Sequence, residues 1–126
     1  MGESALSALR LLIADDDRDM RDWLRAVLSQ RAQVLREAAS GWELLHILSH
    51  DGPFDLVITD VRMPAPSGLN VVAMARAAGL VTPFLIITAF PRQELVAAAL
   101  RMDRVVLLAK PFSAQQLRES MGILMA

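Results

Sequence analysis

Residues 55–64 read DLVITDVRMP, and the fold of the chain can be worked out from this stretch. Its apolar part, Leu56 to Thr59, has the length of a strand and stops abruptly at Asp60. An apolar run without alternating polar residues is typical of a strand covered on both faces, as in a parallel sheet flanked by helices. The stretch therefore predicts a central parallel strand that ends at an acidic residue.

Similar runs recur along the chain on both sides of this stretch. Leu9 to Ala14, Phe84 to Thr88 and Val105 to Ala109 are apolar, apart from Arg10, and each is about one strand long. We interpret them as further strands covered on both faces, and the weaker run from Gln33 to Ala38 as a fifth strand. Because helical patterns separate the runs, the order predicts an α/β, doubly wound fold with a parallel sheet.

The helices between these strands have recognisable starts. Asp17 is placed to cap the first helix, whereas Ser40 and Gly41 open the second. A third is expected from about Leu69 to Ala78, and Pro91 can open a fourth that runs to about Met102. Ser113 and Gln116 predict a capping box for the last helix. One face of the first helix is apolar: Met20, Trp23, Leu24, Val27 and Leu28.

Composition narrows the class of protein. The chain has 126 residues, of which 54% are hydrophobic and 21% charged, so we expect one globular domain over residues 1–126 with a core from about residue 8. A net charge of −1 points neither to direct nucleic-acid binding nor to an anionic membrane. No cysteine is present, and neither a signal peptide nor a spanning segment is evident. These features predict a cytoplasmic protein.

Polar side chains follow the apolar runs at the points where the strands end. Asp15 to Asp17, Asp60, Thr88 and Lys110 hold these positions. Ligands of open α/β sheets bind outside the carboxyl ends of the strands, so these side chains are expected to share one edge. Clustered carboxylates need a cation, and oxygen ligands suit Mg²⁺. An Asp carboxylate can also accept a phosphoryl group, whose charge Lys110 and a metal would stabilise.

The chain resembles the receiver domains of response regulators over residues 8 to 126. The resemblance rests on LLIADDD at residues 11–17, DLVITDVRMP at 55–64, Gly68-Leu69, Ile87-Thr88-Ala89 and Lys110-Pro111-Phe112. Each motif is weak by itself, but all of them in this order at strand ends form a specific pattern. The resemblance implies a flavodoxin-like (βα)5 fold with five parallel strands in the order 2-1-3-4-5.

The resemblance also implies how the chain would hold a metal. Asp15 and Asp16 match the acidic pair that binds Mg²⁺ in these domains. Asp60 matches the phosphoacceptor, which also contacts the metal. The backbone carbonyl of Arg62 matches a further protein ligand. Without the resemblance, Asp15 to Asp17 could simply be acids at a helix start, and Asp17 is expected to be only a cap.

The remaining site residues follow from the same resemblance. Thr88 matches the hydroxyl residue that turns toward the phosphate, and Lys110 matches the lysine that contacts it. The bond between Lys110 and Pro111 is usually cis in such domains. The implied donor is a sensor histidine kinase or a histidine phosphotransfer protein. The output would be an effector domain, a target protein or a homodimer, with autocatalytic phosphorylation rather than dedicated enzyme activity.

Several residues depart from the pattern of the family. Leu107 stands where many receivers carry the aromatic residue that moves on phosphorylation. The turn at residues 101–104 lacks the usual Gly, so it must differ in shape, and Ser67 has no functional explanation. In the family that the chain resembles, the residues two positions after the phosphoacceptor and two after the hydroxyl residue flank the path of attacking water. Here these residues are Arg62 and Phe90, and because both are bulky we predict slow loss of phosphate from Asp60.

Two other functions compete with phosphoacceptance. A pseudo-receiver that binds proteins without phosphate is favoured slightly by Leu107 and disfavoured by the complete set of site residues. An aspartate-dependent phosphatase would carry a second Asp two residues after the nucleophile, where Arg62 stands.

His46 and His50 lack a carboxylate or cysteine partner at metal spacing, and we interpret both as surface histidines.

Overall fold

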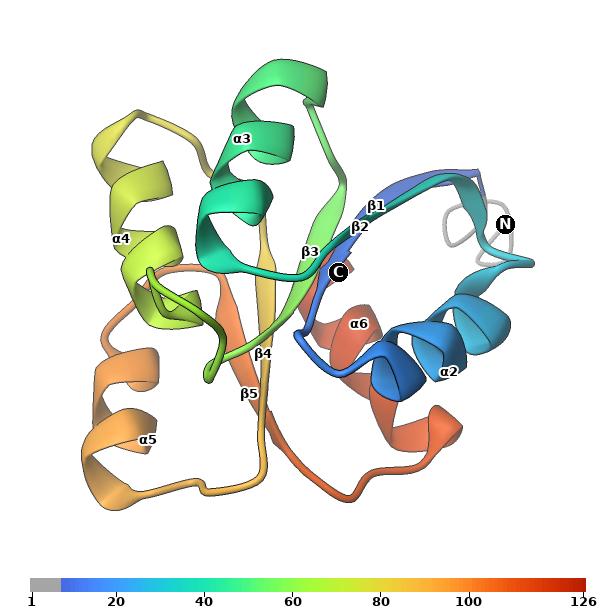
Figure 1. Cartoon of the computed structure of the whole chain (residues 1–126). Coiled ribbons are helices and arrows are strands. Elements are labelled where there is room, and N and C mark those ends of the chain that lie inside the picture. The colour runs from blue at the N-terminus through green and yellow to red at the C-terminus, as the bar shows by residue number, and fades with distance from the viewer. Residues whose placement is uncertain (1–7) are drawn as a thin grey trace.

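The structure, a computed structural model, describes residues 8–126 and alternates strands with helices throughout that range (Figure 1). The strands are β1 (Leu9–Ala14), β2 (Ala32–Ala38), β3 (Leu56–Asp60), β4 (Phe84–Thr88) and β5 (Val105–Ala109). The helices are α2 (Arg18–Leu28), α3 (Gly41–Asp51), α4 (Gly68–Ala77), α5 (Gln93–Leu100) and α6 (Ala114–Met125). All neighbouring strands are parallel, in the order β2-β1-β3-β4-β5, so the predicted topology is confirmed.

Helices cover both faces of the sheet. Helices α3, α4 and α5 lie on one side and α2 and α6 on the other (Figure 1). Successive residues of a strand point to opposite faces, so Leu12 joins the core under α3 and α4, whereas Leu11 and Ile13 join the core under α2 and α6. The central strands β3 and β4 are buried along their whole length, which confirms the interpretation of residues 56–59.

Strand β5 is covered on both faces, as predicted, but incompletely, since alternate residues reach the two cores. Residues 105–108 are only half-buried and Ala109 is exposed. β5 is an edge strand, and the short helix α5 leaves a groove of about 450 Å³ beside it. Strand β2 is the other edge strand of the sheet, and most of its residues are also half-buried or exposed.

Most of the predicted helix starts are confirmed. The side chains of Asp17, Ser40 and Ser113 all accept hydrogen bonds from backbone N–H groups in the first turn of their helices, and Gln116 completes the capping box. Ser67, which had no explanation in the sequence, caps α4 by accepting from the N–H of Asn70.

The boundaries of two helices differ from the prediction. Helix α5 spans Gln93–Leu100 rather than residues 91–102, and its N-cap residue Arg92 makes no side-chain capping bond. Helix α4 spans Gly68–Ala77 instead of residues 69–78. Ends of helices depend on a few local hydrogen bonds, so shifts of one or two residues are expected.

The turn before β5 has the unusual shape that the missing glycine predicts. Arg104 adopts a left-handed backbone conformation with φ of 55°, which is uncommon for a residue with a side chain. The guanidinium of Arg76 holds this region by donating to the carbonyls of Leu80 and Asp103, at 3.0 and 2.9 Å. None of the helices in residues 8–126 is long and apolar enough to cross a membrane.

Candidate functional site

The predicted polar residues do meet at one edge of the sheet. Asp60 ends the central strand β3, which pairs with β1 on one side and β4 on the other. Asp15 directly follows β1, Thr88 ends β4, and Lys110 directly follows β5. Because the strands are parallel and adjacent, these four residues lie on the same side of the sheet.

Lys110 joins the two buried acids. Its Nζ donates to Oδ2 of Asp60 at 2.7 Å and to Oδ2 of Asp15 at 3.3 Å. Asp15 has no exposed surface and Asp60 is 7% exposed. The backbone also positions the lysine, since the N–H of Lys110 donates to the carbonyl of Thr88 at 2.7 Å. The bond from Lys110 to Pro111 is cis, as the family resemblance implies.

Burial and charge shift the pKa values of this cluster. Burial raises the pKa of the Asp15 carboxyl from 3.8 to about 6, and the charge of Asp60 adds to this, while the N–H of Asp17 and Lys110 oppose it. Burial alone would lower the pKa of Lys110, but its contacts with Asp60 and Asp15 outweigh burial and raise that pKa. Lys110 is therefore cationic, but its charge does not return the pKa of Asp15 to the ordinary value.

Short backbone hydrogen bonds orient the polar side chains. Oδ1 of Asp15 accepts from the N–H of Asp17 at 2.9 Å, and Oδ1 of Asp60 accepts from the N–H of Arg62 at 2.8 Å. In each case the donor is two residues further along the chain. Such bonds hold the side chains in fixed directions before any ligand binds.

Thr88 and Phe90 form a third pair of this kind, because Oγ1 of Thr88 accepts from the N–H of Phe90 at 3.0 Å. The guanidinium of Arg62 lies over the Phe90 ring, 4.7 Å from its centroid. Since Arg62 and Phe90 follow Asp60 and Thr88 by two residues, this cation–π pair links the loops after β3 and β4 beside the site.

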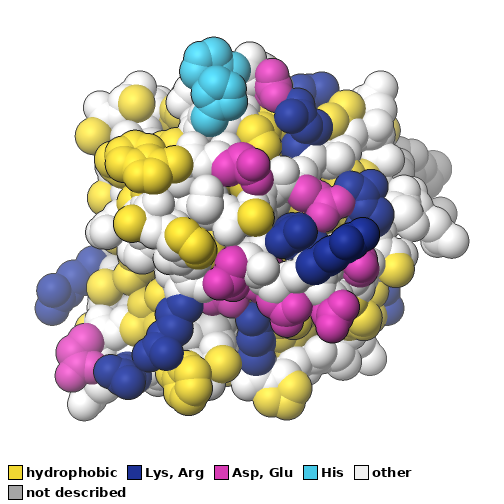
Figure 2. All heavy atoms as spheres, in the orientation of Figure 1, with side chains coloured by type: hydrophobic (Ala, Val, Ile, Leu, Met, Phe, Trp, Pro, Cys, Tyr) yellow, Lys and Arg dark blue, Asp and Glu magenta, His cyan; other side chains and the backbone are white. Residues whose placement is uncertain are grey.

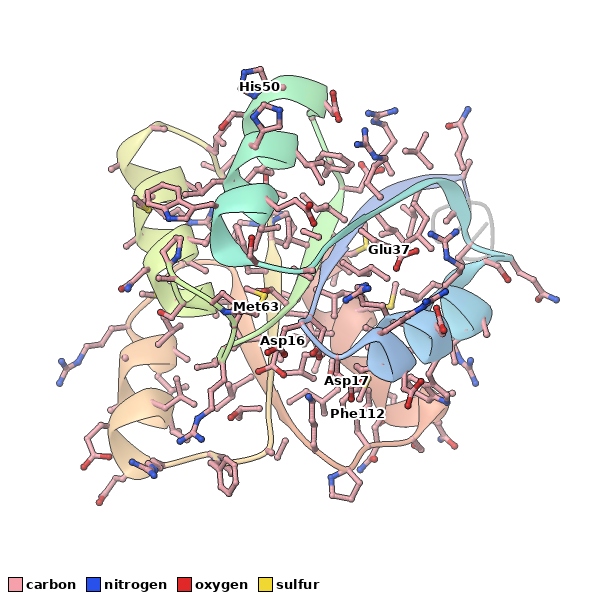
Figure 3. The ribbon with its side chains drawn as sticks, viewed as in Figure 1. Asp16, Asp17, Glu37, His50, Met63 and Phe112 are labelled. Carbon is pink, nitrogen blue, oxygen red and sulfur yellow. The ribbon has the colours of Figure 1, made fainter. Side chains whose placement is uncertain are left out.

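The structure places Asp16 differently from Asp15. Asp16 is exposed at the end of β1, and Asp17 lies beside it at the start of α2 (Figure 3). No group of three or more Asp, Glu or His side chains within residues 8–126 is arranged to hold a metal as the side chains stand. The site therefore consists of two buried carboxylates bridged by Lys110, with a third carboxylate exposed beside them.

The donor set nevertheless suits Mg²⁺. The acids of the cluster offer carboxylate oxygens, and backbone carbonyls lie in the adjoining loops, while no sulfur or imidazole belongs to the set. Mg²⁺ prefers oxygen ligands, needs only one or two carboxylates and retains several waters. A divalent cation would also favour the ionised form of Asp15, whose pKa is raised by burial first and by the charge of Asp60 second.

Arg21 and Glu37 support the site and were not found from the sequence. Arg21 donates to the backbone carbonyl of Asp15 at 2.7 Å and to Oε1 of Glu37 at 3.2 Å. Glu37 lies on β2, and Figure 3 shows it facing α2. Arg25 of α2 also pairs with Glu37. These charged residues are far apart in the sequence, so no local pattern predicts that they pair.

An aromatic pair lies beside Lys110. The rings of Trp23 and Phe112 meet edge to face with centroids 5.6 Å apart. With Met20 and Pro111 they line a cavity of about 300 Å³ next to the lysine. The predicted apolar face of α2 is therefore divided. Leu24 and Leu28 are buried in the core, whereas Trp23 is only partly covered and lines the cavity.

Comparison with known proteins agrees with this fold and identifies the family. The model of the response regulator receiver domain family matches residues 11–121, and the chain belongs to this family. It is 35% identical over 117 residues to response regulator MprA of Mycolicibacterium vanbaalenii, covering 93% of this chain and 50% of that protein. It is 33% identical over 114 residues to response regulator protein PilR of Pseudomonas aeruginosa, covering 90% and 25%.

Solved structures give the same result. The chemotaxis response regulator CheY4 of Vibrio cholerae superposes with a TM-score of 0.82 at 25% identity, covering 94% of this chain and 99% of that one. The chain is thus a receiver domain of a two-component response regulator, a signalling domain rather than a dedicated enzyme. It spans about half the length of MprA and a quarter of PilR.

Proposed function

We propose that this receiver domain accepts a phosphoryl group on Asp60 and that the phosphoryl group changes what the domain binds. The proposal rests chiefly on one observation, which is that Lys110 Nζ lies 2.7 Å from Oδ2 of the buried Asp60. An ammonium group at that distance can also donate to an oxygen of the transferred phosphoryl group and stabilise its negative charge. Thr88, at the end of the adjacent strand, supplies a hydroxyl for a second oxygen.

Asp15, Asp16, Asp60 and the backbone carbonyl of Arg62 would hold Mg²⁺ in this proposal. The ion supplies charge stabilisation for the phosphoryl oxygens when it is bound. In this proposal the exposed Asp16 supplies a carboxylate beside the buried Asp15, and Asp60 is shared between Lys110 and the ion. A cation would favour the ionised carboxylate of Asp15, because burial raises the pKa of this group.

The transfer itself needs few protein groups. A carboxylate oxygen of Asp60 attacks the phosphorus of a phosphohistidine, the new O–P bond forms, and the N–P bond breaks with its electron pair going to the histidine nitrogen. That nitrogen takes a proton from solvent. Lys110 and Thr88 then contact the phosphoryl oxygens. To do so, the Thr88 hydroxyl turns toward the phosphoryl group and gives up the hydrogen bond that it accepts from the N–H of Phe90.

The donor is proposed to be a sensor histidine kinase or a histidine phosphotransfer protein, since the named relatives are response regulators. The output is proposed to be a change in contacts with an effector domain, a target protein or a second copy. Leu107 is half-buried on β5 and has no ring that could rotate, so the change must be carried by other groups.

The proposal is tested by incubating the protein with acetyl phosphate and Mg²⁺ and measuring its intact mass. The parent should gain one phosphoryl group, and Asp60→Asn should not. The matched control is Asp103→Asn, an exposed acid before β5, which should gain phosphate as the parent does. Chelation of Mg²⁺ by EDTA should abolish the gain in all samples.

A poor small-molecule donor is distinguished from a non-functional site by repeating the assay with a phosphorylated histidine-containing protein. Failure with both donors, in protein that binds its partners, would favour the pseudo-receiver alternative. Phosphate found on Asp60→Asn at the level of the parent would assign the acceptor to another residue.

A further inference from the structure

Two histidines form an exposed pair on α3. His46 and His50 are four residues apart, so they lie on the same face of the helix, one turn from each other. Their rings stack with centroids 4.1 Å apart and an angle of 26° between the planes. Both side chains are exposed, and they lie side by side at the edge of the molecule, coloured cyan in Figure 2.

The hydrogen bond of His50 defines which ring nitrogen is available. Nδ1 of His50 lies 2.8 Å from the backbone carbonyl of His46. A carbonyl oxygen only accepts, so Nδ1 carries the proton, and in the neutral ring Nε2 keeps a free lone pair. A backbone carbonyl that fixes the tautomer in this way is the usual support of a metal-binding histidine.

We propose that His46 and His50 form a binding site for a divalent transition-metal ion such as Zn²⁺, Ni²⁺ or Cu²⁺. Two histidines at positions i and i+4 of a helix can reach one ion together, which is how zinc is held in helical His-x-x-x-His motifs. Imidazole ligands suit these ions, whereas Mg²⁺ and Ca²⁺ require oxygen.

The site is incomplete and open to solvent. No third Asp, Glu or His of the described chain joins the pair in a group that could hold a metal. Water would therefore fill the remaining positions, and the affinity would be weaker than that of a structural zinc site with four protein ligands. Ile47 replaces the glutamate that metalloproteases carry after the first histidine, so hydrolysis is not expected.

The pair is separate from the acidic site. His50 lies near the C-terminal end of α3, whereas Asp16 and Met63 lie at the opposite end of that helix, where the strands end (Figure 3). Metal binding at the pair and phosphorylation of Asp60 are therefore separable. The proposal does not depend on the proposed function.

Trp42 provides a local reporter for the experiment. It is 63% exposed and lies on the same face of α3, one turn before His46. Four residues correspond to an axial rise of about 6 Å, so a paramagnetic Ni²⁺ ion held by the pair should quench its fluorescence. The other tryptophan, Trp23, lies on α2.

Ni²⁺ would be titrated into the full chain without a histidine tag, in excess Mg²⁺ so that the acidic site is occupied. We expect saturable quenching in the parent and an affinity at least about tenfold lower in His46→Ala and in His50→Ala. Zn²⁺ should displace Ni²⁺ and restore the fluorescence. Circular dichroism should show unchanged folding, since both side chains are exposed.

Three matched variants complete the test. Ser49→Ala, an exposed residue of the same helix, and Asp60→Asn should both retain the affinity of the parent. Trp42→Phe should bind Ni²⁺ equally well by calorimetry while losing the quenching. Equal affinity in the parent and in a double His46→Ala, His50→Ala variant would overturn the proposal, as would loss of Ni²⁺ binding in Asp60→Asn alone.

Discussion

Replacing Asp15 by Asn should stabilise the folded protein at neutral pH in the absence of metal. The Asp15 side chain is buried, and its pKa rises to about 6 from an ordinary value of 3.8, with burial as the largest cause. Ionising this group in the folded state is therefore less favourable than in the unfolded state. Asparagine has nearly the same shape and carries no charge, so the variant avoids this cost.

The sign and size of the effect follow from proton linkage. Between about pH 4 and pH 6 the folded parent binds more protons than the unfolded parent, so its free energy of unfolding falls as the pH rises. A shift of about two pH units corresponds to about 3 kcal/mol. Because Lys110 also loses a partner, we expect Asp15→Asn to be more stable by about 1–3 kcal/mol above pH 6 and by little below pH 4.

The assay is urea unfolding followed by circular dichroism, in EDTA, at several pH values from 4 to 8. Asp22→Asn is the matched control, because this acid of α2 is exposed, and it should change the free energy of unfolding by less than about 0.5 kcal/mol. Added Mg²⁺ should stabilise the parent more than Asp15→Asn, since a ligand that binds the folded state raises its stability.

Either of two results would refute the reasoning about Asp15. One is an Asn variant that is no more stable than the parent at pH 7.5 in EDTA. The other is a stability difference that stays constant from pH 4 to pH 8, because a titrating carboxyl cannot produce it.

Three further predictions concern the loops and helix ends near the site. A double Arg62→Ala, Phe90→Ala variant should lose phosphate from Asp60 about two- to fivefold faster than the parent, because the pair no longer shields the site from water. The factor corresponds to the free energy of an exposed cation–π contact, and the rate is measured from intact mass over time. Gly68→Ala should lower the free energy of unfolding by about 1–3 kcal/mol, because a Cβ there would lie 2.6 Å from the Asp60 carbonyl oxygen. Ser113→Ala should cost about 1 kcal/mol in urea unfolding, because it removes the capping box of α6.

Each of these predictions has a result that would contradict it, and the last two also have a control variant in the same chain. Equal rates of phosphate loss in the parent and the double variant would contradict the role given to Arg62 and Phe90. Gly122→Ala on α6 meets no neighbouring atom within 4 Å and should stabilise by up to about 1 kcal/mol, so a similar gain for Gly68→Ala would be contrary to expectation. Ser49 lies in the last turn of α3 and is not an N-cap residue, so a loss for Ser49→Ala equal to that of Ser113→Ala would argue against the role of the cap.

The alternation of strands and helices and the polar residues at the strand ends could be predicted because their signals are local, whereas the strand order came from the family resemblance. Residues 56–59 and 84–88 are continuous apolar runs, and such runs form central parallel strands. The polar residue at the end of each run then lies at one edge of the sheet by geometry alone. Asp17 and Ser113 cap their helices through bonds that span two or three residues, so their positions in the sequence were sufficient.

Interactions between distant segments were decided only by the packing of the folded chain. Lys110 contacts Asp15 across 95 residues, and the burial that raises the pKa of Asp15 exists only after the sheet has assembled. The partial burial of β5 depends on its edge position and on the short helix beside it, which an apolar sequence does not reveal. Patterns of a few residues specify strands, helices and caps, whereas burial and charge pairing depend on which surfaces the tertiary structure brings together.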